Sequence, residues 1–299
     1  ALPIFAGGAV GATSNPVLIA QALHADRPYW TERVRLLARD RPAATEDEIA
    51  WLLTEAVAAR GAERLLPIFE RHCGRKGLIS IQTNPKCSRD AQSVVVQAER
   101  FASLRPNFQV KIAATESGIT AIEEATALGI NITATVCFTV SQAIAVAEAV
   151  ERGLDRAAAL GRDARALAPV CAVMCGRLDD WLKVVDERQG YALDPGVIDW
   201  AGVAVLKAAY RLYRERGYRT RLLSAACRSH LHWSQFIGGD LVVSIPPAWQ
   251  RRFNASGIAC RTRIDDPLPD GTLDALYDRF DDFRRAYEPD GLKPAEFDH

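Results

Sequence analysis

A short strand, a turn and a helix are predicted for the stretch Asn107-Phe108-Gln109-Val110-Lys111-Ile112-Ala113-Ala114-Thr115-Glu116-Ser117-Gly118-Ile119. Apolar and polar residues alternate from Phe108 to Ala113, which is the period-2 pattern of a strand. Lys111 therefore points away from the apolar face of this strand. A buried ammonium group is costly unless it is paired, so Lys111 taken alone is best interpreted as a solvent-exposed residue of an edge strand. The rest of the chain changes that interpretation.

Six further segments have the pattern of strands, and segments with helical spacing follow them without any hairpin signal. Such alternation is typical of a parallel sheet. A capped helix start is predicted at Thr45 to Glu48. The predicted strands are 7–13, 77–82, 107–113, 131–138, 168–175, 220–226 and 240–247, and the predicted helices are 17–24, 30–71, 90–104, 118–127, 141–152, 197–217, 248–253 and 273–287.

Polar residues recur at the carboxyl ends of predicted strands that lie far apart in the sequence. In a doubly wound sheet these ends are spread along one edge, whereas in a (β/α)8 barrel they meet at one mouth, where active sites lie. We therefore expect an α/β fold of the TIM (β/α)8 barrel type, with the first of eight strands missing from this sequence. We expect a single domain over 1–299, with a C-terminal helix and tail from about 265 to 299. The polar residues are Asn15, Gln82, Lys111, Thr133, Thr135, Arg177 and Arg228.

Composition excludes several classes of protein. The 299 residues are 48% hydrophobic, and the 37 basic residues balance the 37 acidic ones, which argues against nucleic-acid and membrane partners. No apolar run is long enough to span a bilayer, and the N-terminus lacks the basic region of a signal peptide. The seven cysteines form no CxxC pair, so we expect free thiols in a reducing, cytoplasmic setting. The histidines at 230 and 232 are weak evidence for a metal, and we expect neither metal nor cofactor.

A lysine at a barrel mouth can act as a nucleophile, because desolvation and neighbouring arginines lower its pKa. The resulting iminium withdraws electrons and allows a carbon–carbon bond to break or form. Asn15 and Thr133 are candidate contacts for substrate hydroxyl groups. Arg177 and Arg228 are candidates for a phosphate clamp, because guanidinium groups present several donors in one plane. Either arginine could instead be a structural ion-pair partner.

Five motifs in matching order resemble the transaldolase family, over about 8–247. The segment around Lys111 resembles the family's Schiff-base lysine segment. The five motifs are Gly11-Ala12-Thr13-Ser14-Asn15-Pro16, Val110-Lys111-Ile112-Ala113-Ala114-Thr115-Glu116-Ser117-Gly118-Ile119, Gly129-Ile130-Asn131-Ile132-Thr133-Ala134-Thr135-Val136-Cys137-Phe138-Thr139, Gly176-Arg177-Leu178-Asp179-Asp180-Trp181 and Ser224-Ala225-Ala226-Cys227-Arg228.

The resemblance implies a class I aldolase-type barrel in which Lys111 forms the Schiff base and Thr135 holds the catalytic water. It implies chemistry of the pentose phosphate type on small sugar phosphates. The oligomeric state is not fixed by the sequence, and a homodimer is our working expectation. The substrate-binding residues that it implies are Thr13, Asn15, Thr133, Arg177 and Arg228.

Departures from the family pattern keep the reaction open. The catalytic glutamate of the family falls at Gln82, whose amide can orient a water but cannot transfer a proton. Its two phosphate-site serines fall at Ala172 and Ala226. The fructose 6-phosphate aldolase branch also has glutamine at the position of Gln82, but it has a tyrosine where this chain has Met174. The chosen hypothesis is transfer of a dihydroxyacetone unit between sugar phosphates. The alternatives are an aldolase for a smaller or unphosphorylated carbonyl compound, and a catalytically weak barrel that binds a sugar phosphate or a protein partner.

Overall fold

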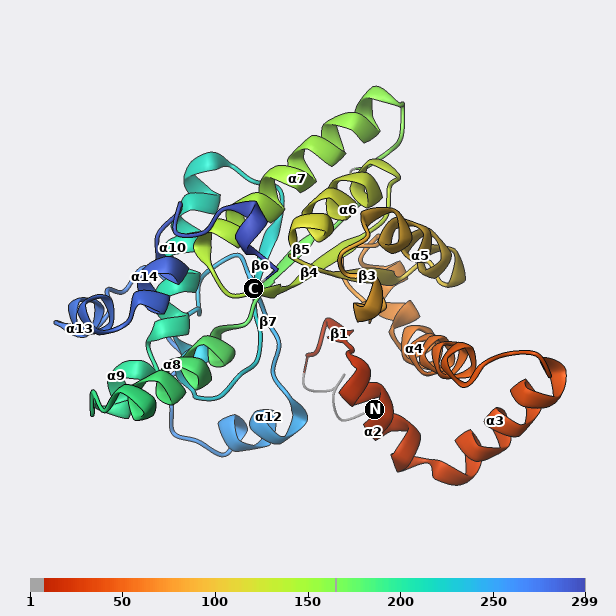
Figure 1. Cartoon of the computed structure of the whole chain (residues 1–299), viewed down its shortest axis with the longest axis horizontal. Coiled ribbons are helices and arrows are strands. Elements are labelled where there is room, and N and C mark those ends of the chain that lie inside the picture. Colours follow the sequence, from red (N-terminus) through yellow and green to blue (C-terminus); the bar gives the residue numbers. More distant parts are fainter. Residues whose placement is uncertain (1–7, 165, 299) are drawn as a thin grey trace.

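A computed structural model of the chain describes residues 8–164 and 166–298. Seven strands form one parallel sheet, in which each strand pairs with the next one along the chain. No pairing joins the first strand to the last within the described ranges, so the curled sheet is an open (β/α) barrel (Figure 1). The predicted parallel barrel is thereby confirmed. The strands are β1 (Gly11–Thr13), β2 (Leu78–Gln82), β3 (Phe108–Ala113), β4 (Ile132–Cys137), β5 (Val170–Val173), β6 (Arg221–Ser224) and β7 (Val242–Val243).

Long helices surround the strands on the outside of the barrel (Figure 1). They are α4 (Glu46–Arg71), α5 (Ala91–Leu104), α6 (Glu116–Ala127), α7 (Val140–Ala159), α8 (Cys175–Gln189) and α10 (Ala201–Arg216). Further elements complete the described chain. These are α2 (Pro16–Ala25), α3 (Arg27–Asp40), α9 (Pro195–Ile198), α11 (Leu231–Ser234), α12 (Pro247–Asn254), α13 (Thr272–Arg279), α14 (Asp281–Tyr287) and the 3-10 turns η1 (Pro85–Cys87) and η2 (Pro294–Glu296).

Three predicted helices are each interrupted, and two observed α-helices have no counterpart among the predicted ranges. The helix predicted over 30–71 is two helices, because a capping box starts α4 afresh. Thr45 Oγ1 accepts from Glu48 N at 3.3 Å, and Glu48 Oε2 accepts from Thr45 N at 2.7 Å. The helix predicted over 273–287 breaks at Phe280, which is extended. The helix predicted over 197–217 is divided between the end of α9 and α10, and the two additional helices are α8 and α11.

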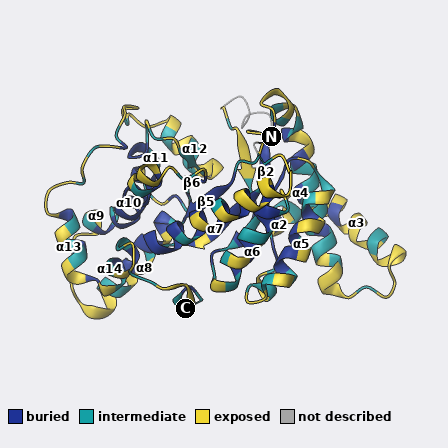
Figure 2. Cartoon of the chain, turned by 90° about the horizontal axis from the view of Figure 1, so that it is seen from above, coloured by how far each residue is buried: buried dark blue, intermediate teal, exposed yellow. Residues whose placement is uncertain are grey.

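The hydrophobic core lies between the outer face of the sheet and the helices. Val110 and Ile112 on β3 are fully buried, as is Ile122 on α6. The alternation in β3 thus directs its apolar side chains outward to the helices and its polar ones inward. Figure 2 shows the helices of the wall buried on the side that faces the sheet and exposed on the opposite side.

Membrane insertion has no support from the helices. None of those in the described residues is both long enough and apolar enough to cross a bilayer.

Candidate active site

The inner face of the sheet is polar from β1 to β4. Residues paired in register on adjacent parallel strands point to the same face. Gln82 is in register with Lys111, and Lys111 with Thr133, so the three side chains form a row. Thr135 lies on the same face one level nearer the mouth, in register with Ala113. The structure therefore brings together four of the predicted site residues.

Lys111 lies on an interior strand, so its interpretation as an exposed edge residue is wrong. Strands β2 and β4 flank β3, and the side chain is largely buried. Burial lowers the pKa of Lys111 to about 8. No carboxylate forms an ion pair with Lys111 within the described parts of the chain, so nothing restores the usual preference for the charged form. About a tenth of this lysine is thus a free amine at pH 7, far more than for an ordinary lysine with a pKa of 10.5.

Lys111 Nζ donates to the main-chain carbonyl oxygen of Ser14, 3.3 Å away. Ser14 is itself held firmly, because its N and its Oγ both donate to the Ser80 carbonyl oxygen, at 3.1 and 2.7 Å. Thr13 is in register with Ser80, which places its side chain on the inner face as well. The end of β1 therefore anchors the tip of the lysine.

Asn15 caps the helix that follows β1. Its Oδ1 accepts from Leu18 N at 2.8 Å, and Pro16 occupies the first position of α2. The amide oxygen of Asn15 is therefore already used by the helix end. The residue lies at the predicted end of β1, but its oxygen is not free for a substrate hydroxyl group.

Two hydroxyl groups meet beneath the lysine. Ser80 Oγ and Thr133 Oγ1 are 3.0 Å apart, and both side chains are buried. Each hydroxyl can donate or accept, so the pair can exchange its donor and acceptor roles when a ligand takes one bond. Thr135 is also buried on this face.

Arg177 lies in the first turn of α8, directly after β5, and Arg228 lies in the neighbouring loop after β6. Arg228 Nε donates to Asp180 Oδ2 at 2.9 Å, and this ion pair is half exposed. Gly176 allows the start of α8 to touch that loop, because a Cβ atom there would lie 2.0 Å from the Ala226 carbonyl oxygen and 2.5 Å from Arg228 Cγ. Arg177 is exposed in the first turn of α8. The structure thus places both arginines together, and Arg228 also has the ion-pair role considered as its alternative.

Asp179 and His232 are buried polar residues that the sequence reasoning did not connect with each other or place in the candidate site. His232 Nε2 lies 2.7 Å from Asp179 Oδ2, and His232 Nδ1 accepts from the main-chain N of Arg228 at 3.0 Å. His232, which the sequence offered only as weak evidence for a metal, is fully buried in α11. The sequence signal that could have pointed to His232 is its position four residues after Arg228, close enough along the chain for a local hydrogen bond to the Arg228 backbone.

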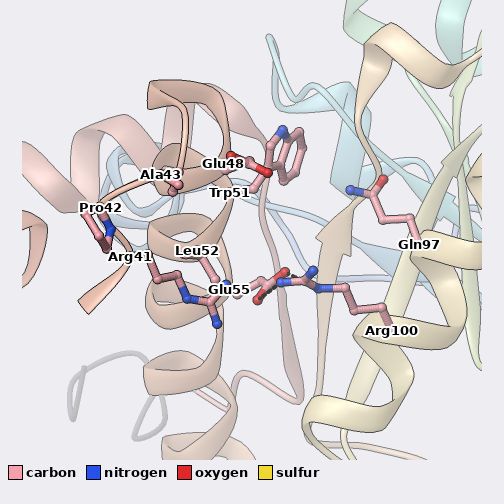
Figure 3. Close-up of a pocket in the computed structure, with 10 residues that line it drawn as sticks. Arg41, Pro42, Ala43, Glu48, Trp51, Leu52, Glu55, Gln97 and Arg100 are labelled. Carbon is pink, nitrogen blue, oxygen red and sulfur yellow. Dashed lines mark hydrogen bonds and ion pairs between the residues drawn. The ribbon is translucent and has the colours of Figure 1, made fainter. Parts of the chain in front are cut away.

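Two cavities differ in size and in position. The larger, of about 530 Å³, lies at the α3–α4 loop and against α5 (Figure 3). Its charged groups are partly used already, since Arg100 pairs with Glu55 at 2.8 Å. The smaller, of about 180 Å³, is lined by Gln82, Thr83 and other residues at the carboxyl ends of β2 to β4. Of the lysine row, Gln82 alone lines the smaller cavity. Its other lining residues include Ile112 and Val94, which pack between the sheet and the helices, so neither cavity is lined by Lys111.

Metal binding has no support from the side-chain arrangement. Within residues 8–164 and 166–298, no group of three or more His, Cys, Asp or Glu side chains is arranged to hold an ion.

Comparison with known proteins gives consistent matches. The family described as Transaldolase/Fructose-6-phosphate aldolase matches residues 4–283. A protein named Transaldolase from Thiobacillus denitrificans is 34% identical over 273 residues, which cover 91% of this chain and 74% of that protein. A protein named Transaldolase 1 from Streptomyces avermitilis is 28% identical over 276 residues, which cover 91% of this chain and 71% of that protein.

Proposed function

Since the chain belongs to the transaldolase/fructose-6-phosphate aldolase family, we propose that it is a transaldolase-type transferase that moves a dihydroxyacetone unit between sugar phosphates through a Schiff base on Lys111. The observation that carries this proposal is the environment of Lys111. It is a buried lysine on the inner face of a barrel, and burial lowers its pKa to about 8. Such an amine is a nucleophile at neutral pH.

The reaction follows from this amine. Lys111 Nζ attacks the ketone carbon of a ketose phosphate, and loss of water gives an iminium. Cleavage of the bond between the α and β carbons moves its electron pair toward the iminium and leaves an enamine, while the departing fragment loses the proton of its β-hydroxyl group and becomes an aldehyde. The enamine then attacks an acceptor aldehyde, and hydrolysis frees Lys111.

Proton transfer is assigned to water held by Thr135 and Gln82. Both side chains lie on the inner face, and Gln82 is in register with Lys111. Gln82 orients the water and does not itself exchange protons, because an amide is neither acid nor base at neutral pH. Thr135 supplies a hydroxyl that can donate and accept at once.

Substrate binding is divided between the two halves of the barrel. Thr13, Thr133 and the amide nitrogen of Asn15 contact hydroxyl groups near the lysine. Arg177 and Arg228 bind the phosphate at the loops after β5 and β6, and Arg228 shares its guanidinium with Asp180. Replacing Arg177 with alanine should raise the KM for fructose 6-phosphate about tenfold, the value of one charge-assisted hydrogen bond.

A second candidate is favoured by Gln82. In this alternative the enzyme is a class I aldolase for a smaller or unphosphorylated carbonyl compound. Ala172 and Ala226 also fit it, because neither offers a hydroxyl group to a phosphate. Assays with fructose 6-phosphate and erythrose 4-phosphate separate the two, since transfer consumes erythrose 4-phosphate and simple cleavage does not.

Borohydride reduction in the presence of fructose 6-phosphate tests the Schiff base. Peptide mapping should find the reduced adduct on Lys111. A Lys111→Met variant is the control and should carry none. If no ketose or aldehyde leaves an adduct on Lys111, both enzymatic candidates fail and the catalytically weak, ligand-binding barrel is favoured.

The cellular setting and the assembly are further parts of the proposal. All seven cysteines are free thiols, which supports a reducing cytoplasm. Light scattering on the purified chain tests the homodimer. Limited proteolysis tests the single domain over 1–299, which should yield no stable smaller core.

A further inference from the structure

A carboxylate–imidazole pair lies buried behind Arg228. Asp179 and His232 have side chains that are 1% and 0% exposed, and Asp179 Oδ2 lies 2.7 Å from His232 Nε2. Asp179 belongs to α8 and His232 to α11, so the pair joins the segments that follow β5 and β6. The proposed chemistry at Lys111 does not use it.

Hydrogen bonds fix the tautomer of His232. Its Nδ1 accepts from the main-chain N–H of Arg228 at 3.0 Å, so Nδ1 carries no proton. The single ring proton is therefore on Nε2 and is donated to Asp179 Oδ2. A protonated imidazolium would place Nδ1–H against the N–H of Arg228, and the observed bond excludes it.

The carboxylate of Asp179 is held from a second side. Its Oδ1 accepts from Gly202 N at 2.8 Å, at the beginning of α10, where the helix dipole favours a negative charge. Burial raises the pKa of Asp179, and the bonds to His232 and Gly202 oppose that effect. On the other side, Ser224 Oγ donates to the His232 carbonyl oxygen at 2.9 Å and fixes the backbone of α11.

The geometry points to Asp179 and His232 as positioning residues for Arg228, which set the affinity for the anionic end of the substrate without touching it. The inference rests on the proposed anion-binding role of Arg228. The side chain of Arg228 is held by a half-exposed ion pair with Asp180 and by a long hydrogen bond, of 3.4 Å, from Nη1 to the carbonyl oxygen of Cys227, and both restrain it weakly. Its main-chain N–H instead donates to Nδ1 of the buried His232. This hydrogen bond fixes the backbone of Arg228, and thereby the point from which its side chain extends.

Four variants separate positioning from general packing. Asp179→Asn replaces an acceptor with an amide, whose NH2 group would face either Gly202 N–H or His232 Nε2–H. His232→Gln reaches toward Asp179 but leaves the N–H of Arg228 without its acceptor. His232→Asn places an amide oxygen near the position of Nδ1 and retains that acceptor. Ser229→Ala is the matched control in the same loop, since Ser229 Oγ has no hydrogen-bond partner among the described residues.

Calorimetric titration with fructose 6-phosphate and with inorganic phosphate gives the main result. Asp179→Asn and His232→Gln should raise both dissociation constants about tenfold, as expected for the loss of one hydrogen bond. His232→Asn should be affected less, and Ser229→Ala should match the wild type. Adduct formation on Lys111 with unphosphorylated dihydroxyacetone should stay within about twofold of the wild type in all four, because Lys111 lies on the other half of the barrel.

Nitrogen-15 NMR of labelled histidine provides a readout that does not depend on activity. The signals of His232 are assigned by their absence from the spectra of His232→Gln and His232→Asn. They should show the Nε2–H tautomer. The Nδ1–H tautomer, or equal losses for phosphorylated and unphosphorylated compounds, would overturn the inference. If the wild type binds neither fructose 6-phosphate nor phosphate, the anion role of Arg228 fails and the inference fails with it. If the wild type binds both and the variants match it, only the positioning role fails.

Discussion

Lys111 on β3 donates a hydrogen bond to the carbonyl oxygen of Ser14 at the end of β1, 3.3 Å away, although β2 lies between the two strands. The lysine side chain therefore extends across the inner face of the sheet. Its acceptor is neutral, so the bond orients the amine without offsetting a positive charge. This combination of fixed position and lowered pKa underlies the first two predictions.

Adduct formation on Lys111 should depend on pH. Below the pKa of about 8 the amine holds a proton that blocks attack, so the trapped yield at a fixed short time should fall about tenfold per pH unit. Above about pH 9 the yield should level off, because the amine is then fully free. Mass spectrometry of the reduced Lys111 peptide between pH 6 and 10 measures this. A flat profile over that range would contradict the assignment of a free amine.

Replacing Lys111 with methionine should stabilise the fold at pH 7. The folded-state pKa of about 8 lies below the ordinary value of 10.5, so the folded state binds the proton less tightly than the unfolded chain. The shift corresponds to roughly 3 kcal/mol of destabilisation, present in full below pH 8 and lost as the pH rises to 10.5. Allowing for the lost bond to Ser14, urea denaturation should show a gain of about 1–3 kcal/mol.

Lys207 provides the matched control for that measurement. It is also a buried lysine, but its Nζ donates to the carbonyl oxygens of Arg263 and Asp266 at 2.8 and 2.7 Å. Lys207→Met would leave both oxygens without this donor, so it should lower the free energy of unfolding by about 1–3 kcal/mol. If both substitutions changed the free energy of unfolding in the same direction, the distinction between a catalytic and a structural lysine would be refuted.

Gln82→Glu should change both the titration of Lys111 and the reaction. A carboxylate in register with Lys111 favours the ammonium form, so the pH at which adduct formation reaches half its maximum should rise. The carboxylate can also exchange protons, so transfer to erythrose 4-phosphate should increase relative to simple cleavage. Initial rates of both reactions, measured on the same preparation, give the ratio. Gln82→Met is the control without proton-transfer capacity, and an unchanged ratio in Gln82→Glu would show that Gln82 does not face the reacting groups.

Gly176→Ala should damage phosphate binding and stability together. The new Cβ atom would lie 2.0 Å from the Ala226 carbonyl oxygen, so the start of α8, which carries Arg177, and the loop that carries Arg228 must separate. Overpacking of this kind costs about 1–3 kcal/mol. Gly257→Ala is the control, because nothing lies within 4 Å of the added atom. Thermal unfolding and the KM for fructose 6-phosphate measure the two effects, and a Gly176→Ala protein indistinguishable from Gly257→Ala would contradict the close packing.

The sequence predicted the barrel because strand and helix patterns are local. The alternation around Lys111 identified β3, and the apolar half of that pattern is what packs against α6. The same alternation predicted that Lys111 points inward. The positions of Arg177 and Arg228 just after predicted strands placed them at the carboxyl end of the barrel. These inferences need only the period of a strand and the parallel arrangement of the sheet.

Features that depend on contacts between distant residues were not predictable. Asp179 and His232 are 53 positions apart, and only the folded loops after β5 and β6 bring them together. The capping of α2 by Asn15 competes with its predicted substrate contact, and sequence spacing cannot say which role holds the oxygen. The residue roles proposed for Thr13, Thr133 and Thr135 stay predictions until the variants are measured.

The polar inner face of β1 to β4 carries the proposed Schiff-base lysine, whereas the paired segments after β5 and β6 carry the proposed anion-binding arginines. The amine of Lys111 depends on Ser14 for its position, whereas Arg228 depends on Asp180 and His232. Substitutions in the second set can therefore change the preferred sugar while the first set stays intact. A barrel organised in this way can diverge in substrate choice by small steps, and it offers the β5–α8 and β6–α11 loops as exchangeable parts for enzyme engineering.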